Sequence, residues 1–168
     1  MTDGDVGAAV LRRLLAEIRA DRRALAERQE ELDTLLVPGG EPAERASATA
    51  LTIDRSYTTL EAMLERVSRT LEGGPPRDEE RHRSLLAGAS LAVEKVRPPV
   101  LRPETVEAAN EIRRFRHFLR HAYTERLRPD RVLELARRWR TGLSLIEADL
   151  DGFERFLEEL ADRVGHRE

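Results

Sequence analysis

Apolar residues recur at helical spacing along almost the whole chain. Leucine and isoleucine form one stripe over about residues 5–36, which ends at Pro38-Gly39-Gly40. A second stripe, from Ile53 to Leu71, steps by four and three residues in turn, which is the spacing of a helix packed in a bundle or coiled coil. Gly73-Gly74-Pro75-Pro76 ends this second helix. Because no stretch shows the strict alternation of a strand, the pattern predicts an all-α protein.

Proline residues divide the second half of the chain into three further predicted helices. The first of them is expected to begin at its N-cap, Asp78, and to be broken by Arg97-Pro98-Pro99. The next runs from Pro103 to about Tyr123, and the last opens at Pro129-Asp130.

We therefore expect a single domain over residues 1–168, folded as an antiparallel bundle of about five helices. The first helix, about residues 1–37, and the last are long, and each could reach about 50 Å at 1.5 Å per residue. We expect their apolar seams to form the core of the bundle itself, although such seams can also pair between chains. Tyr57 and Trp139 lie on apolar seams and are expected in the core.

Composition excludes several classes of function. The chain has no cysteine, so it has no disulfide framework and no thiolate nucleophile or metal ligand. No apolar run approaches the ~20 residues that span a bilayer, and the acidic N-terminus lacks the basic region of a signal peptide. We therefore expect a cytoplasmic protein without a membrane partner.

Charge is distributed unevenly along the chain. The formal net charge is −3, yet the segment from Arg113 to Arg140 holds ten arginines and three acidic residues. A basic block within an acidic chain indicates a local anion-binding site rather than a generally basic protein.

The start of this basic block separates into two faces on the fourth predicted helix. At ~100° per residue, one arc is apolar and is expected to dock into the core: Ile112, Phe115, Phe118, Leu119 and Ala122. The opposite arc carries cations, imidazoles and a phenol: Arg113, Arg116, His117, Arg120, His121 and Tyr123. No acidic residue within the segment compensates these arginines, so a bound anion is expected, and a phosphodiester suits guanidinium geometry.

Arginine and histidine together point to metal-free cleavage of RNA. The 2′-hydroxyl can attack the adjacent phosphorus with His121 as general acid or base, while Arg116 stabilises the charged transition state. These two residues are about 140° apart around a helix. We therefore expect a two-fold dimer to set two copies of this helix face to face around one cleft.

Each candidate also has a plainer interpretation. An arginine-rich stripe is most often a solvated helix face. His82 and His166 are interpreted as structural or solvent-exposed, with a weaker case for His82 at the site. His117 and His121 have the spacing of two zinc ligands, but a third ligand is needed and the positive surroundings repel cations, so we expect no metal and no cofactor.

The residues of the fourth helix resemble the signature of the HEPN superfamily, and within it the HepT-like ribonuclease toxins. The family's motif is an arginine, a polar residue, three variable residues and a histidine, which Arg116 to His121 match. The HepT branch adds one residue and a tyrosine, matched by Ala122-Tyr123. The wider stretch from Arg113 to Tyr123 is similar to a HepT-like subgroup, and the resemblance covers about residues 40–165.

The resemblance implies a metal-independent endoribonuclease toxin that acts as a homodimer on RNA, with transfer RNA as one candidate target. Arg116 and His121 would be the catalytic pair. The supporting residues would be His117, Arg120 and Arg113. The partner in a type II or type VII toxin–antitoxin pair would be a minimal nucleotidyltransferase that transfers AMP to Tyr123, and that phosphate would lie one turn from Arg120 and occupy the cations that RNA needs.

Two other classes of function fit the same pattern. The first is a non-catalytic HEPN module whose arginine face binds a nucleotide or a protein partner. The second is a coiled-coil adaptor built on the first and last helices. RNA cleavage in a chelator would separate the nuclease from both.

Overall fold

A computed structural model describes residues 3–75, 81–121 and 127–166, except for the side chains of residues 3 and 119–121. Its helices are α1 (Asp3–Leu36), α2 (Pro42–Leu71), α3 (Arg81–Ala89), α4 (Pro103–His121) and α5 (Pro129–Gly165). The predictions of an all-α fold, of five helices and of long first and last helices are confirmed.

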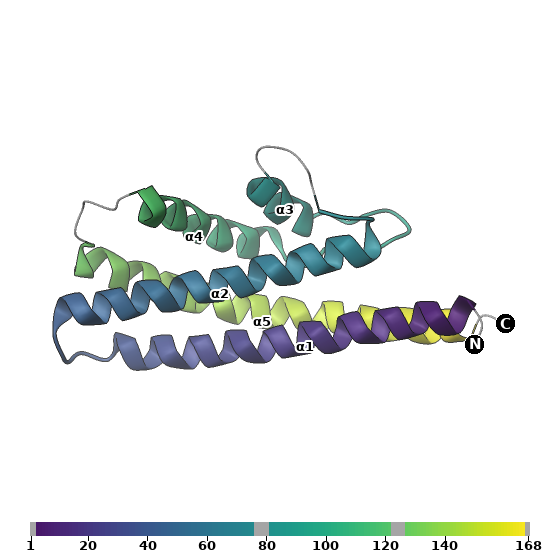
Figure 1. The fold of residues 1–168 in the computed structure, drawn as a ribbon, viewed down its shortest axis with the longest axis horizontal. Coiled ribbons are helices and arrows are strands. Elements are labelled where there is room, and N and C mark those ends of the chain that lie inside the picture. Colours follow the sequence, from purple (N-terminus) through teal and green to yellow (C-terminus); the bar gives the residue numbers. More distant parts are fainter. Residues whose placement is uncertain (1–2, 76–80, 122–126, 167–168) are drawn as a thin grey trace.

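The three long helices α1, α2 and α5 run side by side, and α3 and α4 lie along α2 on one side of the bundle (Figure 1). The beginning of α1 and the end of α5 lie at the same end of the molecule, so these two helices are antiparallel, as expected. Helix α4 packs against α2, α3 and α5. Both of the shorter helices, α3 and α4, therefore pack against α2.

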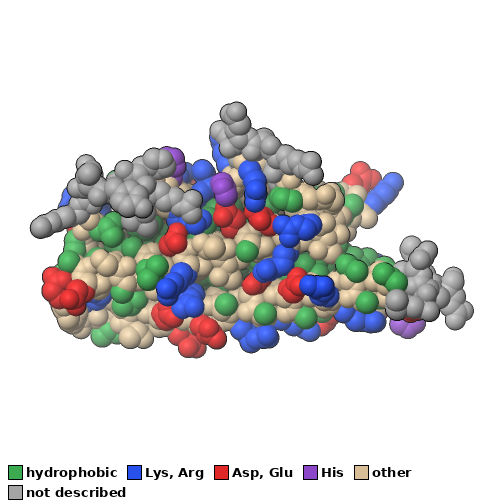
Figure 2. All heavy atoms as spheres, in the orientation of Figure 1, with side chains coloured by type: hydrophobic (Ala, Val, Ile, Leu, Met, Phe, Trp, Pro, Cys, Tyr) green, Lys and Arg blue, Asp and Glu red, His purple; other side chains and the backbone are tan. Residues whose placement is uncertain are grey.

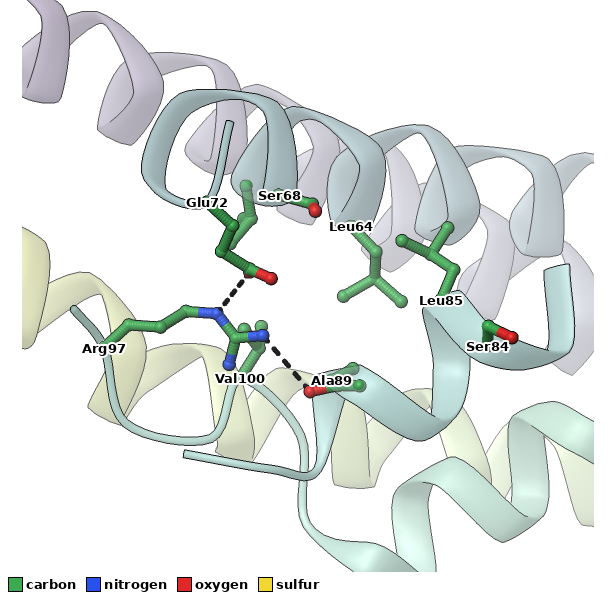
Figure 3. A pocket seen from close by; sticks show the side chains of 10 residues that line it. Leu64, Ser68, Glu72, Ser84, Leu85, Ala89, Arg97 and Val100 are labelled. Carbon is green, nitrogen blue, oxygen red and sulfur yellow. Dashed lines mark hydrogen bonds and ion pairs between the residues drawn. The ribbon is translucent and has the colours of Figure 1, made fainter. Parts of the chain in front are cut away.

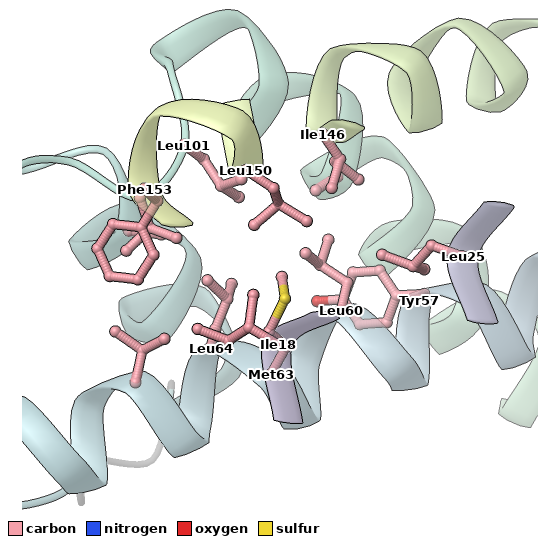
Figure 4. Close-up of a cluster of buried hydrophobic side chains, with 14 of the residues drawn as sticks. Ile18, Leu25, Tyr57, Leu60, Met63, Leu64, Leu101, Ile146, Leu150 and Phe153 are labelled. Carbon is pink, nitrogen blue, oxygen red and sulfur yellow. The ribbon is translucent and has the colours of Figure 1, made fainter. Parts of the chain in front are cut away.

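A large cluster of buried apolar side chains holds the helices together (Figure 4). Ile18 of α1, Leu60 of α2 and Leu157 of α5 are fully buried in it. Tyr57 and Trp139 are confirmed as core residues, since each is only 1% exposed. The seams of the first and last helices are thus buried within the chain itself, and the coiled-coil adaptor hypothesis loses its basis.

Arginine–carboxylate pairs join the polar edges of α1 and α5. Nε of Arg19 donates to Glu154 at 3.1 Å, and Nη2 of Arg22 donates to Asp151 at 2.6 Å. Glu154 also accepts a hydrogen bond from Nη1 of Arg22 at 3.1 Å. Glu154 is only 7% exposed, so its pairs are partly buried, and they set the register of the two helices together with the apolar seam.

The connection from α3 to α4 departs from the sequence prediction. Helix α3 ends at Ala89, well before Arg97, and Leu91 is exposed. The buried side chain of Arg97 donates to Glu72, the C-cap residue of α2, at 2.6 Å and to the carbonyl of Gly88 at 3.1 Å (Figure 3). It also donates to the carbonyl of Leu91 at 2.9 Å. The last carbonyls of a helix lack partners within it, so the guanidinium of Arg97 stabilises the end of α3 by donating to the carbonyl of Gly88. Helix α3 therefore ends before the prolines predicted to break it.

Two predicted helix ends, Asp78 and Tyr123, lie outside the described residues. Within the described ranges, no helix combines the length and the apolar character needed to cross a membrane.

Candidate functional site

The buried face of α4 includes an arginine. This face follows a seam with spacings of four, three and four residues, and each member is at most 9% exposed: Thr105, Ala109, Ile112 and Arg116. The prediction that Arg116 lies on the solvent-facing arc is therefore wrong. So is the burial predicted for Phe118, which is 47% exposed. The seam of small and branched residues enters the core, and Phe115 of the predicted apolar arc is partly buried against Ala46 and Ala50 of α2.

Helix α2 holds the guanidinium of Arg116 through four side chains. Nε donates to Oδ1 of Asp54 at 2.5 Å, and Nη2 donates to Oγ1 of Thr58 at 3.2 Å. Nη1 lies 3.6 Å from Oε2 of Glu61. The guanidinium carbon lies 4.8 Å from the centre of the Tyr57 ring, within cation–π reach. The position of Arg116 is thus fixed from several directions.

These contacts overturn the expectation that the arginines of the basic block are uncompensated. Two carboxylates of α2 compensate Arg116. Elsewhere in the block, Arg138 pairs with Glu111 and Arg140 with Asp33. Charges counted along one segment leave out the carboxylates that other helices supply, so the local positive charge is lower than the sequence suggested.

The Tyr57 hydroxyl is buried and has no hydrogen-bond partner in the part of the chain that the structure describes. Burial raises the pKa of the Tyr57 phenol well above its usual range, and the charge of Glu61 raises this pKa further. The charges of Arg116 and Arg113 act in the opposite direction. The phenol therefore stays protonated near neutral pH and contributes its ring, not a transferable proton.

Arg116 lies at the wall of a pocket of about 130 Å³ formed by α2, α3 and α4. The residues that line the pocket are Tyr57, Glu61, His82, Arg113, Arg116 and His117. Figure 2 shows histidine and basic side chains gathered beside carboxylates in this part of the surface. The structure thus brings together three of the candidates from the sequence, Arg113, Arg116 and His117, around one cavity.

His82 also lines this pocket, although the sequence favoured a structural or solvent-exposed role for it. Its Nδ1 lies 2.5 Å from Oε1 of Glu61. The side chain of His82 is 58% exposed and that of Glu61 is 15% exposed. Since the other carboxylate oxygen of Glu61 faces Arg116, Glu61 links a histidine of α3 to the arginine of α4.

The sequence reasoning missed the acidic residues of the site, although α2 carries a signal for them. Four carboxylates recur along α2 and its C-cap residue at spacings of seven, four and seven residues and so share one helix face: Asp54, Glu61, Glu65 and Glu72. Each of them has a partner from the chain beyond α2: Arg116, His82, Arg81 and Arg97. Glu65 also lies 4.0 Å from Arg69 of α2 itself. An acidic stripe beside an apolar seam predicts a basic neighbour in the bundle.

Three candidates lie outside what the structure describes: the side chains of Arg120 and His121, and Tyr123. Their roles stay predictions. Among the described residues, no group of three or more histidine or acidic side chains could hold a metal ion.

The sequence matches the model of a known protein family. A family model described as HepT-like protein matches residues 48–157, which is more than half of the chain. The protein belongs to the HepT-like family. This is a HEPN-related toxin family, so the predicted resemblance to HepT-like toxins is confirmed. No curated protein and no solved structure matches the chain.

The HepT-like match includes the whole pocket. Every residue that lines it, and Asp54 beside it, falls within residues 48–157, whereas α1 falls outside them. Membership in the HepT-like family indicates a HEPN toxin of the ribonuclease type.

Proposed function

We propose that this HepT-like protein is an endoribonuclease toxin that cleaves RNA without a metal ion, with Arg116 and His121 as its catalytic pair. The observation that carries the proposal is the fixed guanidinium of Arg116 in a pocket that Arg113 and His117 also line. Family membership supports the class of reaction.

Arg116 can still bind a phosphate although two carboxylates flank it. A guanidinium has five N–H groups. In the described part of the chain, Asp54 accepts the Nε hydrogen and Thr58 accepts one Nη2 hydrogen. The second Nη2 hydrogen is left for a phosphate oxygen, and Nη1, which lies 3.6 Å from Glu61, can share its hydrogens with one. Because α2 fixes the guanidinium before a substrate arrives, little reorganisation is needed when negative charge develops on those oxygens.

The ribose of RNA supplies the nucleophile. As the O2′–P bond forms, the P–O5′ bond breaks, which leaves a 2′,3′-cyclic phosphate and a 5′-hydroxyl. One proton must leave the 2′-hydroxyl and one must reach the 5′ oxygen. We assign one of these transfers to His121 and the stabilisation of the phosphorane charge to Arg116. DNA lacks the 2′-hydroxyl, so the choice of RNA follows from the chemistry.

We infer that a homodimer completes the site. Arg116 and His121 are about 140° apart on one helix, and a two-fold partner can bring one residue of each kind to a shared cleft. Phe118, on the same helix, is 47% exposed, and aromatic side chains of this kind are enriched at interfaces. Mixing an inactive Arg116→Lys dimer with an inactive His121→Ala dimer should restore cleavage, because exchange of subunits rebuilds one intact composite site. No recovery after verified exchange would place both residues of a working site in one chain.

The proposed antitoxin is a nucleotidyltransferase that joins the α-phosphorus of ATP to the hydroxyl of Tyr123 and releases pyrophosphate. The new phosphate would lie near Arg120 in sequence and would compete with RNA for the cations of α4. The intact mass of the protein co-expressed with the nucleotidyltransferase should rise by one or more AMP units. A shift that survives in Tyr123→Phe would rule out this residue as the acceptor.

RNA cleavage in EDTA tests the proposed function directly. We expect cleavage by the wild type that is lost in Arg116→Lys and His121→Ala. Arg22→Lys and His166→Ala are matched controls, because Arg22 pairs with carboxylates of α5 and His166 follows the end of α5. Circular dichroism and thermal melting confirm the fold of each variant. Tight nucleotide binding by a wild type that cleaves no RNA would instead favour the non-catalytic HEPN module.

A further inference from the structure

We propose that His82 is a further catalytic residue of this site: the general base that takes the proton from the 2′-hydroxyl of RNA, with Glu61 as its positioning residue. The assignment rests on the proposed ribonuclease function. It is motivated by a histidine–carboxylate dyad that opens into the pocket of Arg116 and that belongs to a different helix from the HEPN motif.

The hydrogen bond between Glu61 and His82 has the direction that a general base requires. Oε1 of Glu61 lies 2.5 Å from Nδ1 of His82. An ionised carboxylate can only accept a hydrogen bond, so the hydrogen is assigned to Nδ1. In the neutral ring, the lone pair is then on Nε2, the nitrogen turned away from the carboxylate. When Nε2 takes a proton, the negative charge of Glu61 stabilises the imidazolium that forms. The carboxylate is largely buried and the ring is largely exposed, so the base is held at one edge and open at the other.

Anchoring of α3 does not account for this pair. The pair is open to solvent on its His82 side, and ion pairs of this kind contribute little to stability. The neighbouring residue Arg81 already pairs with Glu65 of α2, and the buried side chains of Leu85 and Leu86 tie α3 to the core. Helix α3 is thus held without the imidazole of His82.

The position of His82 suits the geometry of the reaction. An in-line displacement sets the attacking and leaving oxygens on opposite sides of phosphorus. Proton transfer is therefore needed on both sides. His82 enters the pocket from α3, whereas Arg113, Arg116 and His117 enter it from α4. A phosphate held by Arg116 would have His82 on its α3 side, and His121 would be left to protonate the 5′ oxygen.

One carboxylate also relates the base to the phosphate-binding group. Oε1 of Glu61 contacts His82, and Oε2 lies 3.6 Å from Nη1 of Arg116. The separation between the proton acceptor and the guanidinium is therefore set by a single side chain of α2. A general base in fixed register with the scissile phosphate is the arrangement that proton transfer in the transition state needs.

A substrate with sulfur in place of the bridging 5′ oxygen separates a base from an acid. A thiolate leaves without a proton, so this substrate needs the base but not the acid. On ordinary RNA in EDTA, we expect single-turnover cleavage by His82→Gln and by His121→Gln to fall ~10²–10⁴-fold, while His166→Gln cleaves as the wild type does. On the sulfur substrate, His121→Gln should recover and His82→Gln should stay slow.

A double-variant comparison tests the positioning role of Glu61. Glu61→Gln removes the charge that stabilises the imidazolium and should lower kcat. Once His82 is already Gln, the second change should lower kcat by a much smaller factor, because a base and the group that orients it act as a unit. The remaining loss reports the contact of Glu61 with Arg116. A carboxylate that merely supported the fold would lower the rate by the same factor in both backgrounds.

The outcomes keep the two proposals apart. If His82→Gln cleaves as fast as the wild type while Arg116→Lys and His121→Gln are inactive, the assignment of His82 is wrong and the ribonuclease function stands. Recovery of His82→Gln on the sulfur substrate would make His82 the acid and overturn its assignment as the base. A wild type that cleaves neither substrate would refute the ribonuclease function, and the role of His82 with it.

Discussion

The guanidinium of Arg116 stacks over the ring of Tyr57 at 4.8 Å, inside the contact between α4 and α2. Both side chains are buried, and the ring belongs to the same core cluster as Ile112, one turn before Arg116 on α4. The proposed phosphate-binding guanidinium therefore packs against the hydrophobic core and does not lie on the solvent-exposed surface. Its placement depends on the packing of two helices, and changes in that packing should be measurable both as stability and as activity.

Tyr57→Phe should stabilise the protein without loss of RNA cleavage. The change keeps the ring under Arg116 and removes a buried hydroxyl that has no partner among the described residues. An unsatisfied buried polar group costs about 1–3 kcal/mol, so the free energy of unfolding in urea should rise by up to that amount. A drop in stability would mean that the hydroxyl has a partner, such as an ordered water.

Tyr57→Leu is the contrasting variant, because it also removes the aromatic face. Loss of the ring gives up a cation–π contact worth about 0.5–2 kcal/mol and leaves a cavity. We expect lower stability and slower cleavage in urea-unfolding and RNA assays of the same preparations. Slower cleavage in Tyr57→Phe as well would contradict the view that only the ring matters.

The pairing of Arg116 with Asp54 should limit the affinity for RNA. Asp54→Asn keeps an oxygen that can accept from Nε but removes one negative charge beside the pocket. We expect the KM for RNA to fall a few-fold, with a steeper dependence on salt, because a phosphate is then less repelled. Asp33→Asn is the matched control: it removes a charge paired with Arg140 between α1 and α5, away from the pocket. An equal fall in KM for Asp33→Asn would mean that the net charge of the protein, not the pairing of Asp54 with Arg116, causes the effect.

The sequence predicts the fold of this protein well because each helix carries its own signal. The seam from Ile53 to Leu71 and the prolines at positions 103 and 129 mark helices that the structure contains. The end of α3 could not be predicted in this way, since it depends on Arg97, whose guanidinium reaches back to carbonyls near the helix terminus. Such a long-range contact of one side chain does not appear in the spacing of apolar residues along the sequence.

The candidate site was predictable only in part, for a related reason. The motif in α4 identified Arg116 and His117, but a helical wheel that sorts residues by polarity places every arginine outside. It cannot show that Arg116 continues the seam of Ala109 and Ile112, since that depends on carboxylates of α2 that neutralise it. The contact between His82 and Glu61 joins two helices and was not accessible to a reading of either one.

Ser56→Ala should destabilise the core without touching the site. The indole Nε1 of Trp139 donates to the buried Ser56 hydroxyl at 2.6 Å, and this hydroxyl donates to the carbonyl of Ile53. Removing the hydroxyl leaves the indole N–H buried without an acceptor, at a cost of about 1–3 kcal/mol. Ser47→Ala is the control. The exposed Ser47 hydroxyl donates to the carbonyl of Ala43, one turn earlier, so its removal should change stability by less than about 0.5 kcal/mol. Equal urea midpoints for the two variants would contradict the importance of the Trp139 bond.

Two glycines of α5 should respond in opposite directions to the same substitution. A Cβ at Gly142 would lie 2.9 Å from the Trp139 ring and 3.2 Å from Cβ of Ala108 on α4, whereas a Cβ at Gly152 meets nothing within 4 Å. Gly152→Ala should therefore stabilise the protein by about 0.5–1 kcal/mol, since alanine favours the helix and restricts the unfolded chain. Gly142→Ala should destabilise it by about 1–3 kcal/mol through overpacking, and should push α4 away from α5.

If α4 carries the phosphate-binding arginine, RNA cleavage should fall in Gly142→Ala and stay unchanged in Gly152→Ala. Thermal melting and cleavage assays on both variants check this, and stabilisation by Gly142→Ala would show that the α4–α5 contact is looser than the structure has it.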